Sequence, residues 1–251
     1  NRDSILSKVQ ETNPYFIVNC AAYTNTEACE DEHTYPLALS VNADGPQNLI
    51  QLCAEYNIGL VHISTDYVFG ENKIDGYLED HTPYSPLNKY GESKVQGEQN
   101  IIKTMGGIKA SDFIKQDPLV YIVRTSSLFG EGATNFIAKI IHYAKEREFL
   151  EVVTDEVVCP TYVKDLSEGI IYLLEQKPKG GIYHYSGNGS CTRKEFAEEI
   201  LKLSGVNTPV RPTTLDKFGR KAKIPNISIL KNSKFPDIRS WREMLSDFLT
   251  V

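Results

Sequence analysis

The sequence is poor in cysteine and lacks the spacings that cross-links or metal sites need. Five cysteines are spread over 251 residues, and none forms a C-x-x-C pair. The five histidines show neither H-x-x-H nor H-E-x-x-H spacing. An odd number of scattered cysteines indicates reduced thiols, which argues against a disulfide framework and a structural zinc site. We therefore expect no metal ligands among these side chains.

Long apolar runs and a strong charge of one sign are also missing. No run approaches the roughly 20 apolar residues that a membrane span needs. The chain opens with NRDSILSKVQ, which is polar and mixed in charge, unlike a signal peptide. The net charge of −6 argues against broad binding to nucleic acid or to anionic membranes. These absences predict a cytoplasmic protein with no nucleic-acid or membrane partner.

What is present is an alternation of strand-like and helix-like segments. Short apolar segments rich in β-formers occur at residues 15–20, 59–64, 118–124, 150–153 and 181–185. Helical patterns occur at residues 3–12, 34–56, 135–147, 165–176, 192–203 and 239–249, and a further helix carries Tyr90. Strands separated by helices indicate βαβ units, and continuously apolar strands indicate a sheet covered on both faces. The pattern predicts an α/β fold with a doubly wound, Rossmann-like parallel sheet, and a surface loop at 103–118.

Small or hydroxylated residues follow three of the predicted strands. They are Ala21, Ala22 and Tyr23 after the first, Thr65, Asp66 and Tyr67 after the second, and Thr125, Ser126 and Ser127 after the third. In an open parallel sheet, ligands bind beyond the carboxyl ends of the strands. Small residues let a flat cofactor approach the backbone, and hydroxyls supply hydrogen bonds without charge. We expect the ligand crevice at this edge.

Tyr90 and Lys94 lie four residues apart on a predicted helix and so share one face. A free tyrosine has a pKa of about 10, and a nearby ammonium lowers that pKa. A tyrosine so tuned can protonate a carbonyl oxygen while hydride reaches its carbon. Thr65, at the end of the preceding strand, is the candidate for a second hydrogen bond to that oxygen.

The alternative is that this pair is an exposed helix face. With 14 tyrosines in the chain, roughly one Y-x-x-x-K is expected by chance. Context favours catalysis, because this Y-x-x-x-K has no second copy in the chain and the helix follows a strand ending in Ser64-Thr65.

Seven blocks carry a resemblance to a known family. They are VNCAAYTNTEACEDE (18–32), HISTDYVFG (62–70), YSPLNKYGESKVQGE (84–98), RTSSLFGEGATNF (124–136), DEVVCPTYVKDL (155–166), GIYHYSGNGSCTRKEFA (181–197) and RSWREMLSDFL (239–249). In this order they resemble the extended short-chain dehydrogenase/reductases, and among these the dTDP-4-dehydrorhamnose reductases. The resemblance implies hydride transfer from NADPH or NADH to the C4 carbonyl of dTDP-4-dehydro-L-rhamnose, giving dTDP-L-rhamnose.

The resemblance also implies roles for individual residues. Thr65, Tyr90 and Lys94 correspond to the catalytic set, with Tyr90 as general acid. The implied cofactor-binding residues are Ala21, Ala22, Tyr23, Asn42, Ser64, Tyr90, Lys94 and Thr125. The implied substrate-binding residues are Asp66, Tyr67, Ser126, Ser127 and Asn135. Some relatives use Mg²⁺ and form homodimers, and neither property can be read from these residues.

The glycine-rich turn that normally cradles a cofactor pyrophosphate is missing. No G-x-G-x-x-G or G-x-x-G-x-x-G opens a βα unit. We therefore expect that the first strands, roughly fifty residues, are absent from this sequence. The expected organisation is a nucleotide-binding core at 1–126 and a smaller substrate-binding lobe at 127–251, with 165–186 returning to the core. The choice between NADPH and NADH stays open, because the residues that normally decide it lie in the missing part.

Two other functions remain open at this point. One is a non-catalytic regulatory subunit of the same fold, like the methionine adenosyltransferase beta subunit. The other is a sugar-nucleotide epimerase or dehydratase of the same superfamily. The intact set of Thr65, Tyr90 and Lys94 favours an enzyme, and the block STDYVFG favours the reductases.

Overall fold

The centre of the molecule is a parallel sheet, seen in a computed structural model that describes residues 1–82, 85–106, 118–132 and 135–250. Its strands are β1 (Phe16–Asn19), β2 (Gly59–Thr65), β3 (Val120–Thr125) and β8 (Gly181–His184), in the order β1-β2-β3-β8. All three pairings are parallel, with Asn19 opposite His62 and Thr65 opposite Thr125. The carboxyl ends of these strands therefore meet at one edge.

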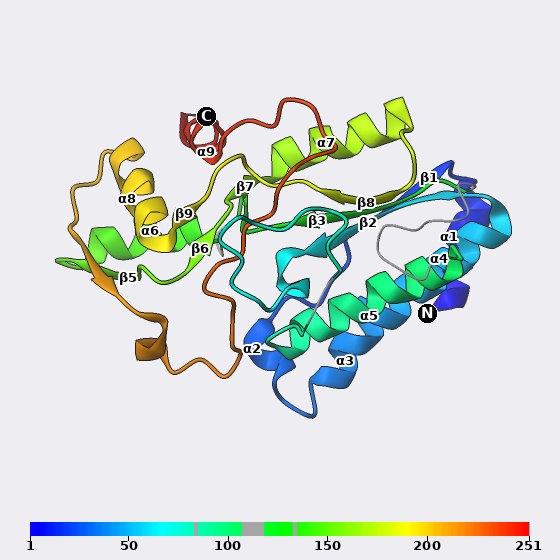
Figure 1. The fold of residues 1–251 in the computed structure, drawn as a ribbon, viewed down its shortest axis with the longest axis horizontal. Helices are drawn as coiled ribbons and strands as arrows, with labels where there is room; N and C mark the ends of the chain where they lie inside the picture. Colours follow the sequence, from blue (N-terminus) through cyan, green and yellow to red (C-terminus); the bar gives the residue numbers. More distant parts are fainter. Residues whose placement is uncertain (83–84, 107–117, 133–134, 251) are drawn as a thin grey trace.

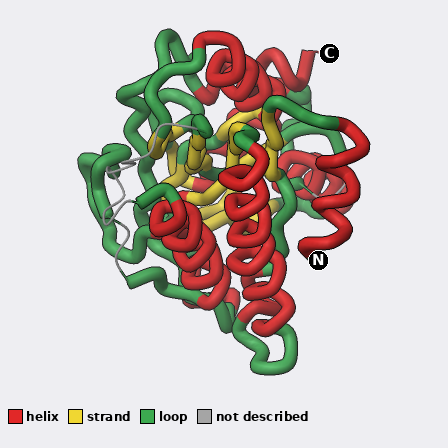
Figure 2. Tube along the Cα trace, turned by 90° about the vertical axis from the view of Figure 1, so that its right-hand side faces the viewer, coloured by secondary structure: helices red, strands yellow, loops and turns green. Residues whose placement is uncertain are grey.

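Helices cover both faces of this sheet, as Figures 1 and 2 show. One face is covered by α1 (Arg2–Thr12), α4 (Gly45–Tyr56) and α5 (Lys89–Thr104), and α7 (Val163–Gln176) and α9 (Trp241–Thr250) lie on the other. Leu60 and Ile122 pack in the cluster on the first side, whereas Val61 and Val123 pack in the cluster on the second. Successive strand residues point to opposite faces, so a sheet buried on both sides needs continuous apolar strands. The predicted doubly wound α/β fold is confirmed.

The chain between Thr26 and Tyr56 is helical with interruptions. It forms α2 (Thr26–Cys29), α3 (Tyr35–Leu39), a π-helical turn at Ser40–Asp44 and then α4. The predicted helix over 34–56 is confirmed, and the π-turn within it had no sequence signal. Residues 107–117, which make up most of the predicted surface loop, lie outside the described residues.

A second lobe lies beside the carboxyl edge of the sheet (Figure 1). It contains α6 (Phe136–Glu146), β5 (Leu150–Val153), α8 (Arg193–Leu203) and β10 (Val210–Thr213), and β5 pairs in parallel with β10. The two-residue strands are β4 (Leu128–Phe129), β6 (Val157–Val158), β7 (Thr161–Tyr162) and β9 (Cys191–Thr192). These short strands and β10 were not predicted, because pairings this short depend on tertiary contacts. The predicted domain boundary at 126/127 stays a prediction.

The segment from residue 226 to 232 runs back from the lobe across the core. Val157 N donates to Asn226 O at 2.7 Å, and Tyr77 N donates to Ile229 O at 2.8 Å. These bonds carry Ser228 into the interior, where it is buried. Farther on, Trp241 is 1% exposed and packs its ring against Phe196, which anchors α9.

In the described part of the chain, no helix combines the length and apolar character needed to cross a membrane.

Candidate active site

Tyr90 is placed by the first turn of α5. Asn88 caps this helix, because its Oδ1 accepts a hydrogen bond from Gly91 N at 2.8 Å. A side chain at position 91 could not be accommodated, since a Cβ there would lie 2.3 Å from the carbonyl oxygen of Tyr67. The helix thus approaches the residues after β2 closely. The rings of Tyr67 and Tyr90 meet edge to face, with their centroids 6.1 Å apart.

The Tyr90 phenol lies against the hydroxyl of Thr65, as the sequence predicted for a shared crevice. A hydrogen bond with Thr65 lowers the Tyr90 pKa, but burial raises this pKa by more, so the net shift is upward. The prediction that an ammonium lowers the Tyr90 pKa is therefore wrong for this structure. The physical reason is that desolvation outweighs the hydrogen bond, and Lys94 directs its charge elsewhere.

Lys94 is 1% exposed and points to the end of β2. Its Nζ donates to Ile63 O at 2.8 Å and lies 3.4 Å from His62 Nε2. Within the described residues, Lys94 forms no hydrogen bond with Tyr90. Burial lowers the pKa of Lys94 to about 8, against the opposing effect of the Glu98 carboxylate. The lysine is thus close to its titration point at neutral pH.

Asp66 gathers hydroxyl groups from three parts of the chain. Its Oδ1 accepts from Thr65 Oγ1 at 3.0 Å, and its Oδ2 accepts from Ser126 Oγ at 2.8 Å and from Ser228 Oγ at 2.5 Å. Burial raises the pKa of Asp66, and the three hydroxyls partly oppose this effect. The carboxylate is 4% exposed, so it orients the Thr65 hydroxyl from inside the protein. Ser228 had no sequence signal, because it joins the site through the returning segment.

Asn42 holds the loop that follows β1. It is fully buried, and its Oδ1 accepts from Tyr23 N at 2.8 Å. Its Nδ2 donates to Tyr23 O at 3.0 Å and to Ser93 Oγ at 2.9 Å. Its amide therefore fixes the backbone of Tyr23, and its predicted role in binding the cofactor stays a prediction.

Ser64 and Thr125 differ in how their hydroxyls are satisfied. Ser64 Oγ donates to Glu98, whose carboxylate forms a buried ion pair with Arg124 at 2.7 Å. Thr125 is 5% exposed, and its buried Oγ1 has no hydrogen-bond partner among the described residues. An unpaired buried hydroxyl costs free energy, so it marks a place where a ligand group would be favoured.

Two predicted substrate residues, Ser127 and Asn135, bond other residues of the site, and their contact with substrate stays a prediction. Ser127 Oγ accepts from Arg193 Nη1 at 2.7 Å. Asn135 caps α6 by accepting from Ala138 N at 2.8 Å, and it donates to the carbonyl oxygens of Gly130 and Gly132. These contacts position the cation and the helix, respectively, that border the neighbouring pocket.

That pocket lies between Tyr67 and the second lobe and has a volume of about 670 Å³. Aromatic and cationic side chains line it, notably Tyr67, Phe136, Phe218, Arg193 and Arg220. The Arg193 guanidinium lies 5.1 Å from the Phe136 ring centre and pairs with Glu156 at 2.9 Å. Arg220 pairs with Glu27 at 2.9 Å. Flat rings and guanidinium groups suit a base and a diphosphate.

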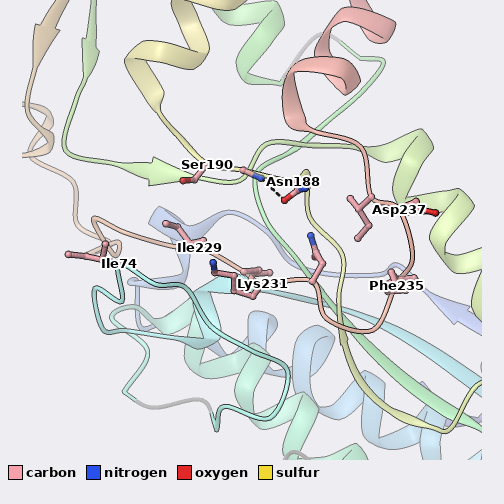
Figure 3. A pocket seen from close by; sticks show the side chains of 11 residues that line it. Ile74, Asn188, Ser190, Ile229, Lys231, Phe235 and Asp237 are labelled. Carbon is pink, nitrogen blue, oxygen red and sulfur yellow. Dashed lines mark hydrogen bonds between the residues drawn. The ribbon is translucent and has the colours of Figure 1, made fainter.

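Sequence reasoning missed most of this pocket wall. The predicted helix over 192–203 already placed Arg193 in a first helical turn, and a capping box of Thr192 and Glu195 begins α8 there, but the place of Arg193 in a pocket wall was not predicted. No comparable local signal marks Phe136 or Arg220. A second hollow of about 550 Å³ is bordered by Ile74, Ser190 and Lys231 and includes none of the predicted site residues (Figure 3).

Within residues 1–82, 85–106, 118–132 and 135–250, no group of three His, Cys, Asp or Glu side chains could hold a metal ion. The magnesium ion that some relatives use therefore gains no support from these side chains.

Comparison with known proteins identifies close relatives. The spore coat polysaccharide biosynthesis protein SpsK of Bacillus subtilis is 35% identical over 94% of this chain and 79% of its own length. The dTDP-4-dehydrorhamnose reductase of Streptomyces griseus is 34% identical over 97% of this chain and 79% of its own length.

Solved structures of dTDP-4-dehydrorhamnose reductases are also similar to this chain. The crystal structure of dTDP-4-dehydrorhamnose reductase from Bacillus anthracis in complex with NADP matches 100% of this chain and 85% of that one, with a TM-score of 0.89 and 36% identity. A dTDP-glucose 4,6-dehydratase from the same organism, at 21% identity and a TM-score of 0.79, shares the fold. The model of the RmlD substrate-binding domain matches residues 1–251. This chain therefore belongs to the RmlD substrate-binding-domain family and is a sugar-nucleotide oxidoreductase.

Proposed function

We propose that this protein reduces the 4-keto group of a deoxysugar nucleotide, dTDP-4-dehydro-L-rhamnose, with NADPH, and that Tyr90 is the general acid. The observation that carries the proposal is the contact of the Tyr90 phenol with the Thr65 hydroxyl, next to a pocket lined by rings and guanidinium groups. The names of the relatives from Streptomyces griseus and Bacillus anthracis support this substrate.

The residues at the strand ends fit a nicotinamide nucleotide. The unpaired Thr125 hydroxyl and the buried Lys94 ammonium, which has donors to spare, are suited to hydroxyl and amide oxygens of such a ligand. NADPH rather than NADH is proposed because the Bacillus anthracis relative is in complex with NADP. When bound, this cofactor supplies the hydride for the C4 carbon.

Tyr90 holds the proton that the carbonyl oxygen needs. A phenol with a pKa at or above its ordinary value is protonated at neutral pH, so Tyr90 has a proton to give. Burial raises this pKa and makes the phenol a weaker acid, so the proton moves as negative charge develops on the carbonyl oxygen. Thr65, fixed by Asp66, keeps the phenol oriented.

The second lobe would hold the rest of the substrate. Phe136 and Phe218 offer faces for the base, and Arg193 and Arg220 offer charge for the diphosphate. Ser127 and Asn135 act here by positioning Arg193 and the start of α6.

The test is an assay with dTDP-4-dehydro-L-rhamnose and NADPH, following the absorbance of the reduced nicotinamide. Turnover is expected for the parent, with a loss of at least about a hundredfold in Tyr90→Phe, the usual size of general acid catalysis. Tyr56→Phe, at a half-exposed residue near the end of α4, is the matched control and should retain parental turnover.

Two results would contradict the proposal. Equal turnover of Tyr90→Phe and the parent would remove Tyr90 as the acid. Tight binding of NADPH without turnover of the sugar nucleotide would favour the non-catalytic regulatory subunit instead.

A further inference from the structure

Behind Lys94 lies a buried polar pair that the proposed reaction does not use. Asn19 and His62 are direct neighbours across β1 and β2, and they are 7% and 0% exposed. Asn19 Nδ2 lies 2.9 Å from His62 Nδ1, and the other ring nitrogen, Nε2, lies 3.4 Å from Lys94 Nζ. On its far side, Asn19 Oδ1 accepts from Ala21 N at 3.2 Å. A continuous chain of contacts thus joins Lys94 to the loop after β1.

Few charged groups lie next to the contacts that join Lys94, His62, Asn19 and Ala21. His62 faces Lys94 from α5, the neutral amide of Asn19 from β1 and the apolar Ile122 from β3. Lys94 faces His62, the carbonyl of Ile63 and the more distant carboxylate of Glu98, which is paired with Arg124. Burial and the charge of Lys94 hold the pKa of His62 well below its ordinary value. The imidazole is therefore neutral and carries one proton.

The position of that proton follows from its neighbours. A neutral imidazole has one donor nitrogen and one acceptor nitrogen. Since Asn19 Oδ1 is engaged by Ala21 N, the amide presents its Nδ2 donor to His62 Nδ1, which must accept. The proton is then on Nε2 and points at Lys94 Nζ. An uncharged amine can accept it, whereas an ammonium cannot.

We propose that Asn19 and His62 form a tautomer relay that couples the charge of Lys94 to the backbone N–H of Ala21. When Lys94 is an amine, His62 donates from Nε2, Asn19 donates to Nδ1, and Asn19 Oδ1 holds the Ala21 N–H. When Lys94 is an ammonium, it donates to Nε2, the imidazole proton is on Nδ1, and the Asn19 amide turns so that Oδ1 accepts that proton. The imidazole carries one proton in both states. The two states differ by the one proton that Lys94 gains or loses.

The consequence lies in the cofactor-facing loop. In the ammonium state the Ala21 N–H faces the Asn19 Nδ2, which cannot accept, so this N–H becomes available to an acceptor on a bound ligand. By linkage, a ligand that accepts from Ala21 favours the charged form of Lys94. Asn19 and His62 are positioning residues in this scheme. Their importance for catalysis rests on the proposed function, whereas the relay itself does not.

The relay is tested by ¹⁵N NMR of the histidine rings in the full chain, recorded from pH 6.5 to 9.5, with His62→Gln to assign the signal. With a Lys94 pKa of about 8, the Nε2–H tautomer of His62 is expected to rise from about one tenth at pH 7 to about nine tenths at pH 9. In Lys94→Met the ring is expected to stay as the Nε2–H tautomer at every pH. A His62 tautomer that does not change with pH in the parent would overturn the proposal, whatever the variants do.

A second variant separates the relay from simple packing. Asn19→Leu removes the amide, so His62 Nδ1 loses its partner and the tautomer is expected to follow Lys94 without any change in the Ala21 amide signal. In the parent, the Ala21 amide signal is expected to titrate together with His62. Independent titration of these two signals in the parent would also overturn the proposal. Neither experiment needs turnover, so a failure here is distinct from a failure of the reductase assay.

Discussion

The strand ends and the neighbouring pocket each contain an ion pair, and the two pairs differ in how far they are exposed to solvent. At the strand ends, Glu98 and Arg124 form an ion pair whose side chains are 1% and 0% exposed. On the pocket side, Arg220 and Glu27 form a pair whose side chains are 35% and 42% exposed. A buried pair is held by the lack of any alternative partner, whereas an exposed pair is weak and exchangeable.

This difference suits two tasks. The buried side must keep Thr65, Tyr90 and Lys94 in fixed positions, so most of its polar groups bond one another, and the Thr125 hydroxyl is the exception among the described residues. On the pocket side, Arg193 is held by the buried carboxylate of Glu156, whereas Arg220 is held by an exposed partner that a diphosphate can replace. Variants on each side should therefore affect different quantities.

The largest effect is expected from Glu98→Gln, which leaves the Arg124 charge buried without its partner. Breaking such a pair costs about 3–5 kcal/mol, measured as the loss in the free energy of unfolding by denaturant titration. The double variant Glu98→Met and Arg124→Met is expected to recover most of this loss, because neither charge remains. A loss below about 1 kcal/mol in Glu98→Gln would make the buried pair equivalent to an exposed one.

The buried side should also show a pH dependence from Lys94. Burial lowers its pKa from 10.5 to about 8, so between these values the unfolded chain binds more protons than the folded chain. Stability therefore rises with pH across this window. Relative to Lys94→Met, the unfolding free energy of the parent is expected to increase by about 2 kcal/mol from pH 8 to 9.5. A constant difference between the two proteins would place Lys94 in a solvated environment.

Arg220→Gln tests the exposed ion pair beside the pocket. We expect about a tenfold weaker affinity for the dTDP-sugar, near 1.4 kcal/mol, because one diphosphate partner is lost. The free energy of unfolding should change by less than about 1 kcal/mol, since the pair with Glu27 is exposed. Arg2→Gln breaks a similarly exposed pair with Glu55, neither of which borders this pocket, and is the control, with unchanged affinity expected. Equal affinities for both variants would exclude Arg220 from the substrate site.

The smallest effect concerns Asn135. Asn135→Ala removes the cap of α6 and is expected to cost about 1 kcal/mol of stability, measured by thermal or denaturant unfolding. Asn135→Ser keeps a capping oxygen and should recover most of it while removing the amide. An unchanged KM in Asn135→Ser is expected if the residue acts as a cap. A raised KM at parental stability would instead support the direct substrate contact inferred from the family resemblance.

Sequence reasoning reached the residues at the strand ends because their signals are local. Tyr90 and Lys94 share a helix face because they are four residues apart. Thr65 and Thr125 end continuously apolar strands, and such strands indicate a parallel sheet covered on both faces. Sequence reasoning could not reach Ser228, because this residue joins the site through a segment whose path depends on contacts with Tyr77 and Val157. It could not reach Arg220, because this residue is placed by its pair with Glu27, which is distant in the sequence.

The sequence by itself determined the α/β fold, the order of its main elements and the edge of the sheet at which the candidate site lies. It could do so because apolar periodicity and the composition of strand ends depend on residues that are neighbours in the sequence. Only the tertiary structure decided the protonation of the site. The Tyr90 pKa rises and the Lys94 pKa falls, because burial removes water from both groups and Lys94 bonds Ile63 instead of the phenol. Desolvation depends on everything packed around a group, and no spacing along the chain encodes it.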